Sequence, residues 1–307
     1  SMLILFTSDL HGKRVLYEEL MITVEKIRPD ILILGGDLLP KLSHDEDIFL
    51  AQHSFINQYL LTFFDRLHQK HILDILIMLG NDDFLSLREE LCCKKNSNSY
   101  HLIDNSKWTT SSGWEIIGFN LVPETPFSLK DLERRDSIGD GVLYPSVSAV
   151  SSVANGYKVI DAREWFLSKC SLSEEIAKLP HIVNPQKTIF VSHAPPYGTT
   201  LDVISNGAHV GSKAIREYIE TNQPLISLSG HIHEAFFMTG SYTAKICKSL
   251  CLWPGQIHCP KLDAIYFNLD DPISSIRHTC ETAPITQNGR KLLKSPFGLE
   301  DRIDFDD

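Results

Sequence analysis

The chain has 307 residues, of which 43% are hydrophobic and 22% charged, a balance typical of a folded globular protein rather than a disordered or fibrous one. Asp and Glu number 39 against 29 Lys and Arg, so the formal net charge is −10, which disfavours a nonspecific grip on a nucleic-acid backbone or an anionic membrane. The first apolar run is short and lacks a basic start, and no later run approaches the ~18 residues of a spanning helix, so we expect a cytoplasmic protein. Seven cysteines, an odd number, argue against a disulfide framework, and we expect reduced thiols packed mostly in the core.

The first part of the chain alternates strands with helices. Residues 3–7 form an apolar strand that runs into Asp9 and His11, and the segment after it has the apolar spacing of a helix before a proline ends it. Residues 31–34 then form a second strand, which is followed by two glycines and Asp37. Both strands therefore end in residue types that bind metals.

The same arrangement returns three more times. After an amphipathic helix expected over about 48–68, a third strand leads into Asn81. Much later, KTIFVSHAPP and PLISLSGHIH are apolar strands that end in His193 and in the pair His231 and His233. Strands separated by helices indicate right-handed crossover units and a largely parallel sheet, in which ligands bind beyond the carboxyl ends of the strands. We therefore expect the five loops to line one crevice.

Other segments depart from this rhythm. Residues 122–185 interrupt it and are typical of an insertion. Short apolar runs between residues 244 and 269 lack intervening helices, which suggests a second, mixed sheet packed on the first. We expect one domain over residues 1–283, followed by a loosely held tail at 284–307.

The strand-end residues suit two divalent ions. In GHIH, residues i and i+2 of a strand face the same way, so His231 and His233 could converge on one point, although such a pair alone is more often two solvated side chains. With Asp37 as a bridge, each ion would have four protein ligands and open positions for water and substrate. Carboxylates, imidazoles and one amide oxygen suit Mn²⁺, Fe or Zn²⁺. The seven candidates are Asp9, His11, Asp37, Asn81, His193, His231 and His233.

These motifs carry a resemblance to a known family. D-x-H in SDLHG, GD in GGDLLP, GN in GNDD, the His of VSHAPP, and GHIH match in type and order the five motifs of the calcineurin-like metallophosphoesterases. The resemblance spans about residues 3–269 and implies an α/β fold, a four-layer α/β/β/α sandwich of two mixed sheets flanked by helices. It also implies that one metal takes Asp9, His11, Asp37 and His233, and that the other takes Asp37, Asn81, His193 and His231.

The resemblance further implies a dimetal hydrolase of phosphate esters. Such ions clamp two phosphoryl oxygens and lower the pKa of a bridging water, so that hydroxide attacks phosphorus in line. We expect a phosphodiesterase acting on small or nucleotide-like substrates, with monoesters or phosphoproteins as an alternative. A second alternative, of another class, is a catalytically silent fold that serves as a protein-binding scaffold. The sequence leaves the substrate, the metal and the oligomeric state open.

One motif departs from the family pattern. In many members a His follows the Asn and protonates the leaving oxygen, whereas this chain has Asp82. An aspartate beside two cations stays ionised and is a poor acid at neutral pH. His209 is therefore the candidate donor, although an exposed loop histidine explains it equally well, and His44 is a weaker candidate. Asp83 is expected to orient the loop.

Basic residues are expected to contact the substrate phosphate. The candidates are Lys130, Arg134 and Arg135 in the aromatic and basic segment TPFSLKDLERRD, or Lys213 and Arg216. Ser212 is a plausible N-cap whose helix start could also hold a phosphate oxygen. Because most charged side chains are solvated surface, each contact is a weak expectation by itself.

Overall fold

Two six-stranded sheets form the centre of the molecule, which the computed structural model describes at residues 2–41, 47–71, 73–93 and 99–281. The first sheet has the order β16 (Arg277–His278), β15 (Ile265–Asn268), β1 (Leu3–Thr7), β2 (Ile31–Leu34), β3 (Asp74–Ile77) and β4 (His101–Leu102). The second has the order β13 (Thr243–Ile246), β14 (Ser249–Leu252), β12 (Ile226–Leu228), β11 (Thr188–Ser192), β6 (Glu115–Phe119) and β5 (Lys107–Thr109). Strands β1 to β3 run parallel, as do β6, β11, β12 and β14.

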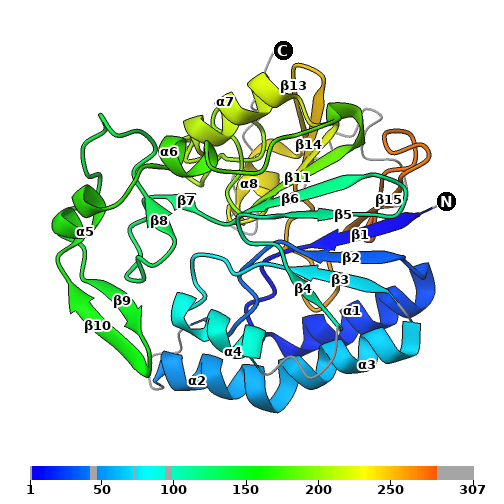
Figure 1. Cartoon of the computed structure of the whole chain (residues 1–307), viewed down its shortest axis with the longest axis horizontal. Coiled ribbons are helices and arrows are strands. Elements are labelled where there is room, and N and C mark those ends of the chain that lie inside the picture. The colour runs from blue at the N-terminus through cyan, green and yellow to red at the C-terminus, as the bar shows by residue number, and fades with distance from the viewer. Residues whose placement is uncertain (1, 42–46, 72, 94–98, 282–307) are drawn as a thin grey trace.

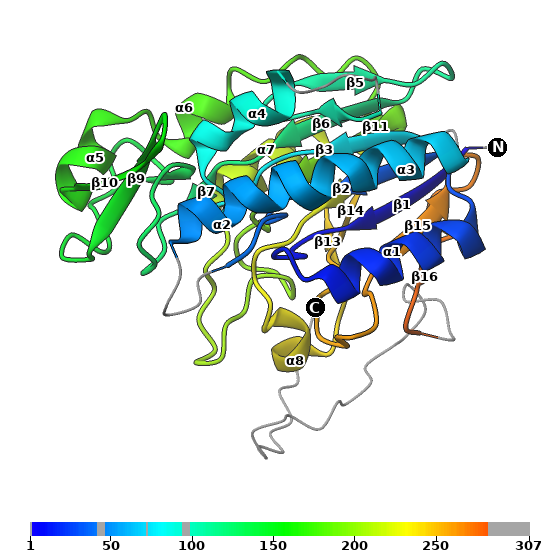
Figure 2. The same ribbon diagram turned by 90° about the horizontal axis from the view of Figure 1, so that it is seen from below.

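Helices cover the outer faces of both sheets. In Figures 1 and 2, α1 (Arg14–Ile27), α2 (Ile48–Phe55) and α3 (Leu61–His71) lie on the first sheet, and α7 (Lys213–Asn222) lies on the second. The π-helical turn Ile56–Leu60 joins α2 to α3, so the helix expected over about 48–68 continues to His71. The shorter pieces are α4 (Arg88–Cys93), α5 (Ala162–Ser168), α6 (Leu172–Ile176), α8 (Ala235–Thr239) and the 3-10 turns Leu85–Leu87 and Pro185–Lys187. This arrangement confirms the predicted α/β fold class with its α/β/β/α layers.

Two apolar cores hold the layers together. In β1, Ile4 and Phe6 belong to the core between the sheets, whereas Leu5 belongs to the core under the helices. All three side chains are fully buried. Since successive residues of a strand point to opposite faces, a strand that is buried on both faces needs apolar residues at every position. This explains the continuous apolar runs of the central strands.

The ligand-bearing strands are divided between the two sheets, which corrects the expectation that all five belong to one largely parallel sheet. Strands β1, β2 and β3 lie in the first sheet and β11 and β12 in the second, and the late strands are likewise divided, with β13 and β14 in the second sheet and β15 in the first. A hydrogen bond from His193 Nδ1 to the carbonyl of Gly35 (2.8 Å) joins the strand-end loops of the two sheets. The loops that carry the candidate ligands therefore come together from both sheets.

Residues 122–185 build a lobe beside the two sheets, on the left in Figure 1. It contains the short pair β7 (Val122–Pro123) and β8 (Glu133–Arg134), the hairpin of β9 (Ala149–Val153) and β10 (Gly156–Ile160), and helices α5 and α6. Its own small apolar core surrounds the buried Phe166. The stretch 284–307, expected to be a tail, lies outside the described residues.

Two other sequence expectations concern the surface. Among the residues that the structure describes, no helix is long and apolar enough to cross a membrane. The cysteines are not packed mostly in the core, because Cys92, Cys170, Cys247 and Cys259 are exposed and Cys251 is buried. The exposed ones lie in turns and at helix ends, where apolar packing does not enclose them.

Candidate metal centre

The seven predicted ligands come from the loops that follow β1, β2, β3, β11 and β12. The first cluster joins one carboxylate to two imidazoles. His233 Nε2 lies 3.1 Å from Asp9 Oδ1 and 3.3 Å from His11 Nε2. His11 Nε2 lies 4.0 Å from the same oxygen of Asp9. Three atoms with lone pairs therefore converge on one point.

The second cluster is built around Asp37. Its Oδ2 lies 3.2 Å from His193 Nε2, which in turn is 3.1 Å from Asn81 Oδ1. The ligand atoms of Asp37, His193 and His231 lie within 4.8 Å of one another. Asp37 Oδ2 is also 3.7 Å from His11 Nε2, so this carboxylate lies between the two clusters. The structure brings the residues together in the two groups that the resemblance implies, and their role as metal ligands stays a prediction.

Several of these residues hold a left-handed backbone. The φ angles are 61° at Asp9, 47° at His11, 52° at Asp37 and 74° at His231. Each such conformation costs about 1–3 kcal/mol in a residue other than glycine and persists only where the surroundings impose it. Hydrogen bonds between the loops impose it here, from Asp9 N to Gly36 O (3.0 Å) and from His11 N to Asp37 O (2.8 Å). Strain gathered in this way is typical of a functional site.

Two glycines allow the backbone to approach the carboxylates. A Cβ atom on Gly80 would lie 2.2 Å from Asp37 Oδ1, and one on Gly230 would lie 2.3 Å from Asp9 Oδ2. Any side chain at either position would displace a candidate ligand. The glycines of GND and GHIH are therefore required by the packing of the site.

The carboxylates and histidines shift one another's pKa values. Burial acts to raise the pKa of Asp9, but the hydrogen bond from His233 and the charge of His193 outweigh it and lower this pKa to about 2. Burial lowers the pKa of His11 to about 4, and burial together with the charge of His193 lowers that of His231 to about 3. Ionised carboxylates and neutral imidazoles are the forms that bind metal ions.

His193 and His233 are the exceptions in this group. Burial acts to lower the pKa of His233, but its hydrogen bond to Asp9 outweighs this and raises that pKa. For His193 the shift is larger. Burial acts to lower its pKa, but the negative charge of Asp37 raises it to about 10. The proton on His193 Nε2 then points toward the carboxylate of Asp37. His193 Nδ1 donates to the carbonyl of Gly35, which fixes the ring with Nε2 toward Asp37. Such an outer hydrogen bond is usual for a histidine that binds a metal.

The donor set fits two divalent cations. The two Nε2 atoms that face each other at 3.3 Å, from His11 and His233, both lie close to the oxygen of Asp9. His11 Nδ1 is buried and has no hydrogen-bond partner among the described residues. Nitrogen and oxygen donors of this kind suit Mn²⁺, Fe or Zn²⁺.

Asp82 and Asp83 have different environments. Asp82 Oδ2 lies 3.9 Å from His11 Nδ1 and 3.0 Å from the ammonium of Lys41. Burial and the nearby charge of Asp37 raise the pKa of Asp82 to about 6.

Asp83 is fully buried and accepts hydrogen bonds from the backbone N–H groups of Leu38 (3.0 Å), Leu39 (2.9 Å) and Gly80 (2.8 Å). It therefore ties the second motif loop to the third. These hydrogen bonds fit the loop-orienting role expected from the sequence, and the part that Asp83 plays in the reaction stays a prediction.

The candidate proton donors are less directly connected to the clusters. His209 Nδ1 donates to the buried carboxylate of Asp202 (2.6 Å), and its ring lies 5.8 Å from that of Tyr197. Its side chain is 33% exposed. These contacts orient the imidazole, and its function as a general acid stays a prediction. His44 lies outside the described residues.

The basic residues of the insertion serve its own structure. Lys130 is completely buried and binds Glu133 (2.7 Å), and the buried Arg135 donates to the carbonyls of Ile138 (2.8 Å) and Asp140 (3.2 Å). The expectation that Lys130 and Arg135 bind substrate phosphate is therefore corrected. Arg134 donates to two neighbouring carbonyls, and its contact with substrate stays a prediction.

The N-terminus of α7 already binds a carboxylate of the protein itself. Ser212 is the N-cap, as expected, because its side chain accepts from Ile215 N (3.0 Å). However, Asp136 of the insertion already accepts from Ser212 Oγ (2.5 Å) and Lys213 N (2.6 Å). A carboxylate thus fills the place proposed for a phosphate oxygen, which corrects that expectation.

Arg216, the other basic candidate of α7, donates to Glu220 (2.8 Å) and to the carbonyl of Tyr197 (3.0 Å). The ammonium of Lys213 lies over the Tyr197 ring, 5.2 Å from its centroid. Both cations therefore have local partners, and a contact of either with substrate stays a prediction.

Sequence reasoning missed Lys41, which lies beside Asp82. Its ammonium also lies over the ring of Phe127, 5.3 Å from the centroid. The position of Lys41 four residues after Asp37, in GGDLLPK, was a signal that could have identified it.

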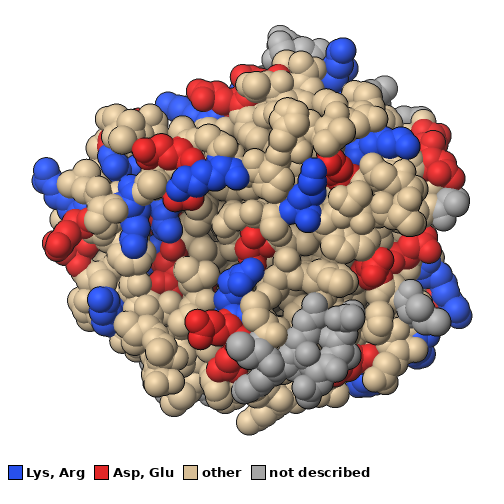
Figure 3. Space-filling model, viewed as in Figure 1, with Lys and Arg blue, Asp and Glu red and all other residues tan. Residues whose placement is uncertain are grey.

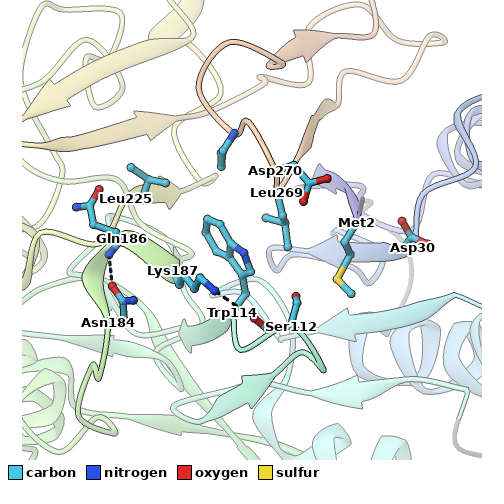
Figure 4. A pocket seen from close by; sticks show the side chains of 11 residues that line it. Met2, Asp30, Ser112, Trp114, Asn184, Gln186, Lys187, Leu225, Leu269 and Asp270 are labelled. Carbon is cyan, nitrogen blue, oxygen red and sulfur yellow. Dashed lines mark hydrogen bonds between the residues drawn. The ribbon is translucent and has the colours of Figure 1, made fainter.

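A hollow of about 540 Å³ lies at the opposite, amino ends of the strands (Figure 4). Its lining includes Met2, Asp30 and Leu225, which precede β1, β2 and β12. None of the seven candidate ligands lines it. It is therefore separate from the candidate metal centre.

Comparisons with known proteins concern the fold and the family of this chain. An uncharacterized protein of Methanocaldococcus jannaschii, MJ1162, is 48% identical over 63 residues, which are 19% of this chain and 29% of that protein, so the match spans less than a third of the relative's length. TT1561 of Thermus thermophilus aligns over 90% of this chain and 97% of its own at 16% identity and a TM-score of 0.52, and another crystal structure aligns over the same shares at 16% identity and a TM-score of 0.57. These two likenesses concern the fold alone. Residues 2–235 match the family model described as calcineurin-like phosphoesterase, and the chain therefore belongs to that family.

Proposed function

We propose that this protein is a metal-dependent hydrolase of phosphate esters that uses two divalent ions. The observation that carries the proposal is the pair of buried clusters that share Asp37 at the strand ends. Membership of the family supports it. The proposed ligands are Asp9, His11, Asp37 and His233 for one ion and Asp37, Asn81, His193 and His231 for the other.

Hydrogen bonds from neighbouring residues hold the proposed ligands in place. Two divalent ions, when bound, would supply Lewis acidity toward phosphoryl oxygens and lower the pKa of a bound water. Asp37 offers Oδ2 to both clusters, while its Oδ1 accepts from the backbone N–H of Asp82 (2.9 Å), which holds the carboxylate in place. Asp83 holds the loops that carry Asp37 and Asn81 against each other.

The substrate is proposed to be a small or nucleotide-like phosphodiester. This preference is supported by Asp82, which stands where many family members have a proton-donating His. The net charge of −10 and the interspersed basic and acidic side chains on the face drawn in Figure 3 suit a small substrate better than a long nucleic acid. Because seven cysteines, an odd number, disfavour a disulfide framework, we propose that the protein acts in the cytoplasm.

Turnover and metal content together test the function. Protein purified with Mn²⁺ is expected to bind two ions and to hydrolyse bis(4-nitrophenyl) phosphate faster than 4-nitrophenyl phosphate. Asp37→Asn is expected to lose hydrolysis and part of the bound metal, because the shared position needs a negative charge between two dications. Full activity of Asp37→Asn would contradict the shared-ligand assignment, and fewer than two bound ions without turnover would favour a binding scaffold instead.

A further inference from the structure

Asp82 places a second carboxylate near Asp37 in the candidate metal centre. It stands where many family members have the His that protonates the leaving oxygen, and it lies close to Asp37. A departing oxygen gains negative charge as its bond to phosphorus breaks. A second carboxylate beside that oxygen would repel it, and a cation next to Asp82 would offset this repulsion.

Lys41 is a cation that lies next to Asp82. Its ammonium lies 3.0 Å from Asp82 Oδ2, and Asp82 Oδ2 lies 3.9 Å from His11 Nδ1. Burial acts to lower the pKa of Lys41, but the charge of Asp82 outweighs it and raises this pKa, so the ammonium stays protonated.

The ammonium keeps hydrogen-bonding capacity for a ligand. It has three N–H donors, of which Asp82 takes one among the described residues, and one side of it lies over the Phe127 ring. The side chain is 49% exposed. A donor therefore faces accessible space beside the candidate metal centre.

The insertion holds Phe127 in place. The backbone N–H of Phe127 donates to Thr125 Oγ1 (3.2 Å), and the carbonyl of Thr125 accepts from the buried ammonium of Lys130 (2.8 Å). Glu133 binds Lys130 (2.7 Å) and accepts from the backbone N–H of Thr125 (3.0 Å). Hydrogen bonds among Thr125, Lys130 and Glu133 thus hold the turn that carries Phe127, whose ring contacts Lys41.

We propose that Lys41 stabilises the negative charge on the leaving oxygen and that Phe127 positions Lys41 for this task. The inference rests on the proposed hydrolysis. In that reaction the bond from phosphorus to the leaving oxygen breaks, and a bond from phosphorus to the oxygen of water forms. The attacking water gives up one proton, the leaving oxygen gains one from His209 or from solvent, and Lys41 keeps its own proton throughout. The contribution of Lys41 is therefore largest for esters with poor leaving groups.

Two esters that differ in the leaving group test the role of Lys41. Phenyl methyl phosphate needs more stabilisation of its leaving oxygen than 4-nitrophenyl methyl phosphate does. Lys41→Met should lower kcat/KM about 10- to 100-fold for the phenyl ester, the range for losing a hydrogen bond to a charged group, and about 3-fold or less for the nitrophenyl ester. Lys41→Arg should retain most of the activity, and bound metal should be unchanged in both variants.

Lys70→Met is the matched control. Lys70 forms an exposed ion pair with Glu25 on the helices of the first sheet, so its loss should change neither ester. Equal losses on the two esters for Lys41→Met would overturn the proposal, because a residue that binds phosphate or shapes the loop affects both alike. If the wild-type protein cleaves neither ester, the proposed function fails and this inference fails with it.

The role of Phe127 is tested by combining variants. Phe127→Ala should reproduce part of the loss on the phenyl ester, and Phe127→Trp should retain the activity because the indole ring also binds a cation. In the Lys41→Met background, Phe127→Ala should add about 2-fold or less, since residues that act as one unit are not additive. Fully additive losses would overturn the positioning role.

Discussion

At the level of single residues, the candidate centre combines strained backbone with close packing. Asp9, His11, Asp37 and His231 all have positive φ, and hydrogen bonds between neighbouring loops hold them there. The cost of this strain is offset by the rest of the fold. The residues that gather here could be predicted from the sequence, because each follows a recognisable apolar strand. The strain could not, since it depends on contacts between loops that are distant in the chain.

The two histidines of GHIH are predicted to serve different ions. The atoms of His233 group with Asp9 and His11, whereas those of His231 group with Asp37 and His193. His233→Ala should therefore deplete one ion and His231→Ala the other. Anomalous scattering from crystals of each variant loaded with Mn²⁺ would locate the remaining ion. Loss of the same ion in both variants would contradict the assignment.

His209 is predicted to donate the proton to a poor leaving group. General acids typically contribute about 10²- to 10⁴-fold in rate, so His209→Ala should slow hydrolysis of an alkyl ester severely and that of a nitrophenyl ester little. The contact with Asp202 orients the ring for such a role. Steady-state rates on the two esters make the comparison, with Asp202→Asn as a companion that weakens the orienting bond. A uniform loss for His209→Ala would assign it to phosphate binding or loop structure.

At the level of elements, the insertion shows why basic residues are hard to assign from sequence. Lys130 and Glu133 are three residues apart, a spacing that usually indicates a solvated surface pair. In the structure both are completely buried, and the pair organises the turn before β8. Burial of this kind depends on segments that pack over the turn from elsewhere in the chain, so the aromatic and basic pattern alone did not reveal it.

The buried pair is predicted to be important for stability. Lys130→Met leaves the Glu133 carboxylate buried without its partner, which typically costs about 3–5 kcal/mol. Lys130→Met with Glu133→Gln should cost less, because no unpaired charge remains. Denaturant unfolding of the wild type and both variants measures the differences, with Lys70→Met as the exposed control. A change of about 1 kcal/mol or less for Lys130→Met would contradict this account.

At the level of the whole molecule, two sheets stack so that five strand ends form one site. The alternation of strands and helices predicted the loops correctly but placed them on one sheet. Local patterns identify a strand, whereas pairing between strands depends on contacts far apart in sequence. For the same reason the sequence did not predict that Lys41 of the second motif loop meets Phe127 of the insertion.

The central claim is that one centre with two divalent ions hydrolyses phosphate esters, and a metal titration of turnover tests it most directly. Metal-stripped protein should not cleave bis(4-nitrophenyl) phosphate, because the clusters around Asp9 and Asp37 would lack the ions that activate water. Adding Mn²⁺ should restore turnover, which should level off at about two ions per chain if both clusters are needed. Turnover that is complete with one ion, or no turnover while two ions are bound, would contradict the account.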